Sequence, residues 1–529
     1  MKLELGPILY MGRSEPTRWR FHVNMLFQGG SADAPPPVVV DSEDKGVTVA
    51  GPVLAADFSD AGGRHCWRWT VTVKRATAER RISYRVRAAG GEVAGLPEKP
   101  VGPVMVPAQG LLPRMAFFSC NGVSSEKHFH RVSDPQGLWE DMVQMHRGEF
   151  ADSPHTPGYH LLVGGGDQVY ADSLWDDEPL NSLGRLSEKK RRAAPVPPGF
   201  ETALRRMYVE LYVKRWSDPF MREAMRCIPG VFTWDDHDIF DGWGSHDPEL
   251  QASPCYEVIY RAAAAAFEAF QVGGTRDTLR LGDAGHFLQA ASFHEKHWEL
   301  DVLLLDLRSG RTQSRVLSDR QWDDVRAWLA GRAASTRRRH LVVVSTIPLV
   351  HLRFSETLDA LPNLGGLDDD RIDQWEHSLH RGERARLMMW LLEHARDPRC
   401  RVTLLSGDVH VAAHGIITST HPDHVSPGQT RTIIHQVTSS GIVNPPPSDL
   451  EFWFMRRISS DSREFIADEV YTEMLEVTTG KRYLNARNWL STVFDEPGPS
   501  EQGPDLRMRM WMKWFTDKGG VEPEVRVEV

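Results

Sequence analysis

From Met115 onward, short uninterrupted apolar segments alternate with longer segments whose apolar residues recur at helical spacing. The apolar segments are MAFFSC (115–120), YHLLVGG (159–165), VLLLDLR (302–308), HLVVVST (340–346) and RVTLLSG (401–407). The segments predicted to be helical include 203–216, 261–271, 318–330 and 382–395. Strands that are apolar on both sides belong in a sheet covered on both faces. This region predicts an α/β domain whose ligands collect beyond the carboxyl ends of its strands.

The first 108 residues follow a different pattern. Residues 18–25, 66–74 and 81–88 alternate apolar and polar side chains and are rich in β-branched and aromatic residues, as strands of a half-buried sheet are. A chain of 529 residues exceeds what one hydrophobic core usually supports. We therefore expect a small β-sandwich domain over 1–108 and a catalytic domain over 109–529, ending in a helix and a strand that extend the core.

Composition restricts the classes of partner. The formal net charge of -10 argues against nucleic-acid or acidic-membrane binding, because either needs a basic surface. The N-terminus resembles no signal peptide, and no segment approaches the roughly 18 apolar residues of a membrane span. A cytoplasmic protein is expected. The cysteines are few, scattered and odd in number (Cys66, Cys120, Cys227, Cys255, Cys400), which does not suggest a disulfide framework.

The segment VFTWDDHDIFDGWG (231–244) follows an apolar entry with Asp235, Asp236, His237, Asp238 and Asp241. Carboxylates at this density repel one another unless a multivalent cation lies among them. Two further strand ends carry similar residues. GGGDQVY (164–170) supplies Asp167 and Tyr170, and SGDVH (406–410) supplies Asp408 and His410. Carboxylate and imidazole are the ligands of hard and borderline metals, so the three strand ends predict one metal site.

Single residues of this set have alternative interpretations. Cys120 ends an apolar strand and could be a buried small side chain, a nucleophile or a thiolate ligand. Tyr170 could be an ordinary core tyrosine, whereas as a ligand it would favour ferric iron over zinc. Asp306, Arg308 and Arg311 leave the strand at 302–308, and an arginine fork suits an oxyanion. The insert at 187–199 is expected to be a solvated loop, and the insert at 361–383 a lid over the site.

The ordered motifs SC, GDxxY, WDDHD, LDxRxxR and SGDVH, together with TSSG at 438–441, resemble those of the PhoD-like alkaline phosphatases in the metallophosphoesterase superfamily. The resemblance runs from about Ala116 to Gly441. It implies a four-layer αββα catalytic domain that binds ferric iron and calcium, with other divalent metals as alternatives. An N-terminal β domain also precedes the catalytic domain in that family.

Carried over residue by residue, the resemblance implies that Cys120, Asp167, Tyr170 and His410 hold iron, and that Asp167 bridges to calcium, which Asp408 also binds. His237 would lie beside the phosphate. The family often has asparagine shortly after its WDDHE motif, where this chain has Asp241. Asp236 and Asp241 are both candidate ligands in that segment, and Asp241 is favoured. Arg311 is a candidate catalytic residue.

The sequence therefore predicts a hydrolase of phosphoric esters that uses metal-activated hydroxide at a dinuclear centre, with a small-molecule phosphate ester as substrate. A phosphodiesterase or nuclease with the same centre is the alternative enzyme. A metal-dependent binding protein without turnover is the alternative from another class. Nucleic acid is expected only as a substrate, and no membrane partner is expected. Sequence alone does not give the natural substrate or the oligomeric state.

Overall fold

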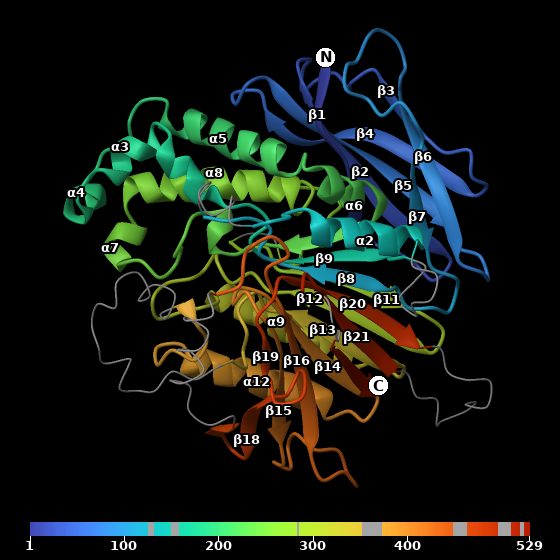
Figure 1. The fold of residues 1–529 in the computed structure, drawn as a ribbon, viewed down its shortest axis with the longest axis vertical. Helices are drawn as coiled ribbons and strands as arrows, with labels where there is room; N and C mark the ends of the chain where they lie inside the picture. Colours follow the sequence, from blue (N-terminus) through green and yellow to red (C-terminus); the bar gives the residue numbers. More distant parts are fainter. Residues whose placement is uncertain are drawn as a thin grey trace.

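The computed structural model describes residues 1–124, 132–149, 158–282, 285–351, 373–447, 463–495, 509–518 and 523–528. Two large β-sheets occupy its centre (Figure 1). The first sheet has the order β22 (Glu524–Glu528), β21 (Arg509–Thr516), β20 (Asn488–Asp495), β8 (Met115–Phe118), β9 (Leu161–Gly165), β10 (Gly230–Thr233), β1 (Lys2–Met11), β2 (Arg18–Gln28), β5 (Arg64–Lys74) and β4 (Val47–Phe58). Its central strands β8, β9 and β10 are parallel.

The second sheet has the order β11 (Gln289–His294), β12 (Trp298–Leu304), β13 (Arg338–Val344), β14 (Cys400–Ser406), β16 (Thr432–Ser439), β15 (Ala412–Ser419), β18 (Val470–Leu475) and β17 (Arg463–Ala467), with β19 (Tyr483–Leu484) beside β15. Strands β12, β13, β14 and β16 are parallel. A smaller sheet contains β3 (Val38–Asp41), β6 (Arg80–Ala88) and β7 (Val101–Val106). The strands expected from the apolar segments after Met115 are confirmed.

Helices lie outside the two large sheets. The described helices are α2 (Gly137–Arg147), α3 (Leu180–Gly184), α4 (Glu188–Arg192), α5 (Phe200–Arg215), α6 (Pro219–Cys227), α7 (Pro248–Gln251), α8 (Pro254–Phe270), α9 (Asp319–Ala333) and α12 (Arg381–Ala395), and the short helical turns include η1 (Ala171–Asp176) and η2 (Asp236–Asp238). Helices α5 and α8 lie on the side of the first sheet, and α9 and α12 on the side of the second (Figure 1). The four predicted helical segments coincide with parts of α5, α8, α9 and α12, and none extends more than one residue beyond its helix.

Alternation along β13 shows how the layers are held together. Val342 and Val344 belong to the core shared with the first sheet, whereas Leu341 and Val343 pack in a second core with α9 and α12. Successive side chains of a strand point to opposite faces, so a strand between two layers must be apolar throughout. The uninterrupted apolar segments of the sequence are explained by this four-layer αββα arrangement.

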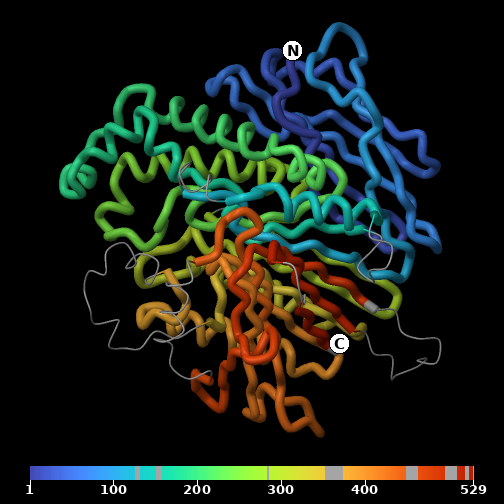
Figure 2. Tube along the Cα trace, viewed as in Figure 1, coloured from blue at the N-terminus to red at the C-terminus, as the bar shows by residue number. Residues whose placement is uncertain are grey.

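The N-terminal strands pair with the catalytic sheet. Strand β1 runs parallel to β10 at Tyr10 and Gly230, and β2, β5 and β4 follow it in antiparallel order. Figure 2 shows this blue N-terminal segment beside the green helices. The expected β structure is confirmed. Strands on either side of residue 108 share one sheet and one hydrophobic core. The division into two domains at this residue stays a prediction.

The C-terminal segment returns to the centre of the molecule. Strand β20 pairs antiparallel with β8 through Leu490, Ser491 and Thr492. This is the strand that was expected to extend the core near the C-terminus. The helix expected just before it falls largely on residues 448–462, outside the described residues. Most of the 361–383 insert, expected to be a lid, also lies outside them. The insert at 187–199 begins with the short helix α4, not a loop.

Two further expectations concern the whole described chain. All five cysteines are buried and unpaired by disulfides, in agreement with their scattered spacing. Among the helices that the structure describes, none has both the length and the apolar character needed to cross a membrane.

Candidate metal centre

The candidate site lies where loops leave the carboxyl ends of parallel strands in both large sheets. Cys120 follows β8, Asp167 follows β9, and the segment from Asp235 to Asp241 follows β10. The second sheet contributes Arg308 and Arg311 after β12, and Asp408 and His410 after β14. Parallel strands end at the same edge of a sheet, which is why motifs far apart in the sequence meet here.

The backbone at this edge is held in an uncommon conformation. Cys120, Asp167, Asp408 and His410 have positive φ values of 51°, 55°, 67° and 53°. Non-glycine residues in this region cost about 1–3 kcal/mol each and cluster at functional sites. Next to Asp167, a Cβ on Gly166 would lie 2.9 Å from the Cβ of Asp235. Glycine is therefore needed where the loops after β9 and β10 approach each other.

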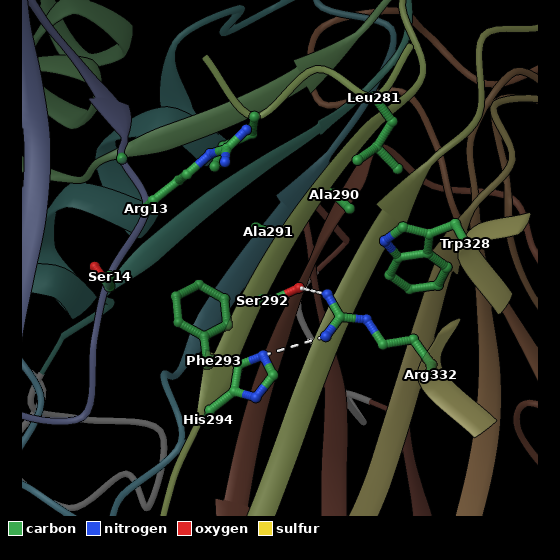
Figure 3. A pocket seen from close by; sticks show the side chains of 12 residues that line it. Arg13, Ser14, Leu281, Ala290, Ala291, Ser292, Phe293, His294, Trp328 and Arg332 are labelled. Atoms are coloured by element: carbon green, nitrogen blue, oxygen red, sulfur yellow. Dashed lines mark hydrogen bonds between the residues drawn. The ribbon is translucent and has the colours of Figure 1, made fainter. Parts of the chain in front are cut away.

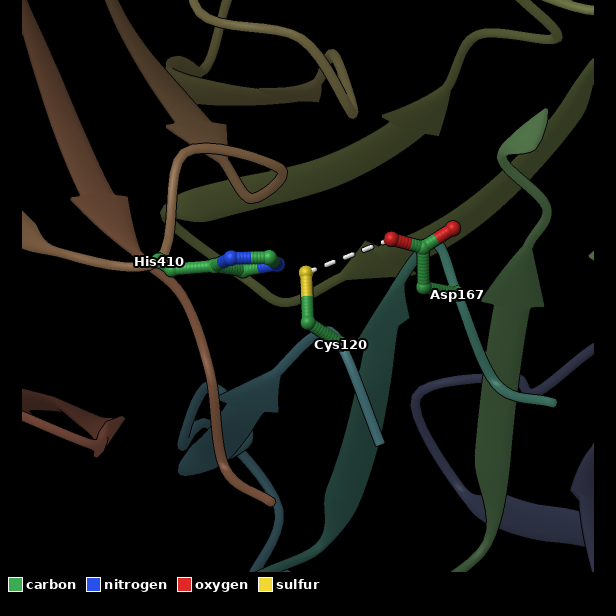
Figure 4. Close-up of side chains that lie close together, drawn as sticks. All are labelled: Cys120, Asp167 and His410. Atoms are coloured by element: carbon green, nitrogen blue, oxygen red, sulfur yellow. Dashed lines mark hydrogen bonds between the residues drawn. The ribbon is translucent and has the colours of Figure 1, made fainter. Parts of the chain in front are cut away.

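A first group of ligand-bearing side chains, here called the cysteine cluster, consists of Cys120, Asp167 and His410 (Figure 4). One ligand atom from each lies within 4.8 Å of the others. The Cys120 Sγ is 3.4 Å from Asp167 Oδ2. The hydroxyl of Tyr170 lies at the same distance, 3.4 Å, from that oxygen. The structure thus brings together the four residues expected to hold iron.

Two residues that sequence reasoning did not single out support this cluster. Asn444 Nδ2 donates a hydrogen bond of 2.9 Å to the Tyr170 hydroxyl. Ser440 Oγ lies 3.2 Å from Cys120 Sγ and accepts a hydrogen bond of 3.0 Å from the His410 backbone N–H. Both follow β16, Ser440 within the TSSG sequence and Asn444 three residues after it, so their position after a parallel strand was the available signal.

A second group, here called the histidine cluster, consists of Asp167, Asp236 and His237, again with ligand atoms within 4.8 Å of one another. Asp167 belongs to both clusters. Its Oδ1 is buried and has no hydrogen-bond partner among the described residues. An unpaired buried carboxylate oxygen is costly unless a cation accompanies it. The donor set therefore fits a bound cation at Asp167.

His237 is oriented by a carboxylate that the sequence analysis missed. Asp172 Oδ2 lies 2.7 Å from His237 Nδ1, and the ring of Tyr170 stacks on the imidazole with centroids 4.3 Å apart. Burial lowers the pKa of His237, but the charges of Asp172, Asp236 and Asp167 outweigh burial and raise it well above its usual value. Asp172 stands only two residues after Tyr170, which was the available signal.

Arg308 and Arg311, which were expected to suit an oxyanion, bind carboxylates of the protein instead. Arg308 is fully buried, forms an ion pair with Asp235, and lies 3.3 Å from an oxygen of Asp236. Both its terminal nitrogens donate to Asp373, at 2.7 and 2.6 Å. Arg311 Nε lies 3.0 Å from the same carboxylate. A direct contact of Arg311 with substrate stays a prediction.

Asp373 is a further residue that the sequence analysis did not identify, because it stands in the 361–383 insert. Burial would raise its pKa, but Arg308 and Arg311 hold it well below the usual range. Its neighbour Gln374 donates a hydrogen bond of 2.9 Å to Asp408 Oδ2. Asp408 lies outside the two clusters, and burial with nearby carboxylates raises its pKa to about 7. The end of this insert therefore contacts both the arginines and a predicted ligand.

The remaining aspartates of the 231–244 segment differ in role. Asp238 Oδ1 accepts backbone hydrogen bonds of 3.0 Å from Gln168 and Val169, so it fastens the loop after β9 to the loop after β10. Asp241, the favoured ligand of this segment, is exposed. Its backbone N–H donates to Asp172 Oδ1 at 2.7 Å. The structure brings Asp236, and not Asp241, into a cluster with Asp167.

The pKa shifts of the cysteine cluster and of Tyr170 are also compatible with a bound cation. Burial and nearby charges raise the pKa values of Cys120, Asp167 and Tyr170 well above their usual values. Burial and the charge on His237 lower the pKa of His410 to about 4, which keeps its imidazole neutral and able to bind a metal. A bound cation reverses the penalty on the anionic forms, because it becomes the largest local charge.

A family model described as PhoD related phosphatase matches residues 114–364 and 355–481, more than half of the chain. The chain belongs to the PhoD-related phosphatase family. The match spans Cys120, Asp167, Asp236, His237 and His410, the residues of the two clusters.

Similarity to a solved structure of PhoD supports this fold. A solved structure of PhoD covers 98% of this chain and 91% of its own, with a TM-score of 0.52 at 15% identity. A purple acid phosphatase from yellow lupin covers 98% of this chain and 73% of its own, with a TM-score of 0.49 at 11% identity. An uncharacterized protein of Saccharomyces cerevisiae is 23% identical over 71% of this chain, which spans 64% of that relative's length.

The different positions of Asp236 and Asp241 give a first prediction. We expect Asp236→Asn to lower the metal content of the purified protein, because it removes a carboxylate from the histidine cluster. Asp241→Asn should leave metal content unchanged, since its side chain is exposed. Metal analysis of both variants by mass spectrometry, with circular dichroism as the control for folding, makes the comparison. Loss of metal in Asp241→Asn alone would restore Asp241 as the ligand.

Proposed function

We propose that this protein is a metal-dependent hydrolase of phosphoric esters with two metal positions that share Asp167. The observation that carries the proposal is the pair of ligand clusters joined at this carboxylate, whose Oδ1 is buried and has no partner among the described residues. Membership of a phosphatase-related family supports the reaction class.

In this proposal Cys120, Asp167, Tyr170 and His410 would hold ferric iron, and Asp167, Asp236 and Asp408 would hold calcium or another divalent ion. The phenolate of Tyr170 would suit a strongly Lewis-acidic ion, and the Cys120 thiolate would add negative charge beside it, whereas an all-carboxylate set suits a hard cation. When bound, two cations supply the charge that activates water and clamp the oxygens of a phosphate.

The chain's own contribution to the reaction rests on His237. Asp172 fixes its Nδ1, which leaves Nε2 as the nitrogen that can meet a substrate. A protonated imidazole there stabilises the negative charge that develops on the phosphoryl group, or donates a proton to the leaving oxygen. Stacking on Tyr170 also holds the ring in place.

The proposed activity is tested directly with p-nitrophenyl phosphate and bis-p-nitrophenyl phosphate. We expect turnover of at least one ester, loss of turnover after chelation, and recovery when iron and calcium are returned together. The ratio of the two rates assigns a monoesterase or a diesterase. Asp167→Asn is the matched negative control, since it removes the shared ligand. A fully metallated protein that hydrolyses neither ester would favour the binding-protein alternative.

Tyr170 allows a test of iron that does not depend on activity. A phenolate bound to ferric iron absorbs visible light by charge transfer, so the iron-loaded wild type should be coloured. Tyr170→Phe should lose the band while other ligands keep part of the iron. Visible spectra and metal analysis of both proteins make the measurement. An iron-replete wild type with no band beyond that of the variant excludes Tyr170 as a ligand.

His237→Ala tests proton donation. If His237 contacts only the substrate, the metals should stay bound while kcat falls by roughly 10²- to 10⁴-fold, as for loss of general acid–base help. The fall should be smaller for p-nitrophenyl phosphate than for an alkyl phosphate, because a good leaving group needs less protonation. Equal losses on both esters would leave an electrostatic role, and loss of metal would make His237 a ligand.

A further inference from the structure

A hollow lined by cations, here called the cationic hollow, lies on the N-terminal strands β2, β5 and β4, which Figure 1 shows at one end of the first sheet. Its volume is about 600 Å³. The lining residues are Thr17, Arg18, Arg20, Gly46, Thr48, Thr72 and Lys74. Pockets for small molecules typically measure roughly 300–1,000 Å³. The cationic hollow is therefore large enough for a small ligand.

Strand register places its three cations on one face of the sheet. Arg18 of β2 lies directly opposite Lys74 of β5. Arg20 stands two residues further along β2, opposite Thr72. Cross-strand partners point to the same face, and so do residues two apart along a strand. Trp19, between the two arginines, points the other way and is buried in the core. The cations therefore share the face that points away from the core.

The three cations have no carboxylate partner. Among the described residues, no ion pair joins Arg18, Arg20 or Lys74 to an acid, and no residue that lines the hollow is acidic. Glu15, on the turn before β2, contacts Arg18 through backbone hydrogen bonds. Like charges directly opposite each other destabilise a sheet. An anion between Arg18 and Lys74 would remove this repulsion.

Arg332 of α9 shows the contrast with an arginine that is already engaged. Its guanidinium donates to Ser292 Oγ at 2.8 Å and lies 3.4 Å from His294 Nε2 (Figure 3). Asp301 lies 3.5 Å from it. Such a group must lose contacts within the protein before it binds a ligand. The side chains of Arg18 and Lys74 have no such contacts with the described residues, so they can bind an anion directly.

Arg20 is held in place beside these exposed cations. Its backbone N–H donates to Ser14 Oγ at 2.9 Å, and its C=O accepts from the Gly12 N–H at 3.0 Å. A Cβ on Gly12 would lie 3.0 Å from Arg20 Cγ, so glycine there leaves room for the arginine stem. Arg20 is half-buried, whereas Arg18 and Lys74 are exposed. The hollow thus combines one restrained cation with two that can adjust to a ligand.

The groups that line the hollow suit several phosphate groups at once. Thr17, Thr48 and Thr72 add hydroxyl groups to the three cations, and all of these groups can donate hydrogen bonds to phosphate oxygens. One phosphate group carries about −1.5 to −2 charge near pH 7, less than three cations balance. The formal net charge of -10 opposes the approach of nucleic acid or an acidic membrane. A small anion is the better fit.

We propose that the cationic hollow binds a small soluble anion that carries two or more neighbouring phosphate groups. One group lies between Arg18 and Lys74, and another meets Arg20. Binding at this site involves neither metal nor turnover. The proposal is therefore independent of the hydrolase function proposed above.

The test is calorimetric titration of the full-length protein with inositol hexasulfate, whose sulfate groups resemble phosphate in charge and oxygen atoms but offer no phosphoric ester to hydrolyse. We expect one binding site. Methyl sulfate should bind at least about tenfold more weakly, because a single anionic group cannot meet all three cations. Added salt should weaken binding, since exposed charges are screened. Inositol hexakisphosphate should compete with the probe.

Variants locate the binding. Arg18→Gln and Lys74→Gln should each weaken the probe by about tenfold and leave turnover of p-nitrophenyl phosphate unchanged. Lys74→Gln should not lower the unfolding temperature of the free protein, because it removes a like-charge pair. Arg222→Gln is the matched control, an exposed arginine of α6 that does not line the hollow. Asp167→Asn should also bind the probe normally, since it changes only the metal centre.

Several outcomes would overturn the proposal. Equal affinity for methyl sulfate would show that the cations do not act together. Unchanged binding in both Arg18→Gln and Lys74→Gln, or loss of binding in Asp167→Asn, would place the probe elsewhere. No binding, or no competition by inositol hexakisphosphate, would exclude the ligand class. Tighter binding of single-stranded DNA, or of vesicles with phosphatidylinositol bisphosphate, would assign the hollow to a macromolecule or a membrane. Each result holds whether or not the protein hydrolyses phosphoric esters.

Discussion

The structure depends above all on how a set of buried carboxylates is compensated at one edge of two sheets. Asp167, Asp235, Asp236 and Asp238 are all buried within the same group of loops. Burial without compensation would cost several kcal/mol for each charge. Burial raises the pKa values of Asp235 and Asp238 to about 7, against the opposing effects of Arg308 and of backbone hydrogen bonds. The fold therefore tolerates these charges only with partners.

The partners divide the carboxylates into two kinds. Arg308 forms ion pairs with Asp235, Asp236 and Asp373 and joins them in one buried network. Asp238 accepts hydrogen bonds from backbone N–H groups and so connects the loops after β9 and β10. Asp167 receives neither an arginine nor a backbone donor at Oδ1. The Oδ2 of Asp235 also has no partner among the described residues, but Arg308 compensates the charge of that carboxylate. Asp167 lacks an arginine and is shared by both ligand clusters, which supports a cation there more strongly than the number of acids does.

Much of this arrangement could be predicted from the sequence. Uninterrupted apolar strands indicated a sheet covered on both faces, and motifs at their carboxyl ends had to meet, so Cys120, Asp167 and His410 could be placed together. Side-chain partners between loops could not be predicted. Asp172 had only its place two residues after Tyr170 as a signal, Asp373 stands at no strand end and shows no periodicity, and the exposure of Asp241 depends on how the chain turns after η2. Pairing of β1 with β10 is likewise a tertiary contact that alternation within a strand does not reveal.

The same division of charges bears on which group meets the substrate. An arginine beside a phosphatase site would ordinarily be assigned to the phosphate. Here Arg308 is fully buried and surrounded by three carboxylates, so binding a phosphate would require those contacts to break. His237 is only partly buried and has one nitrogen fixed by Asp172. In the mechanism we propose, the arginine positions the carboxylates, and the histidine supplies the positive charge that the phosphoryl group meets.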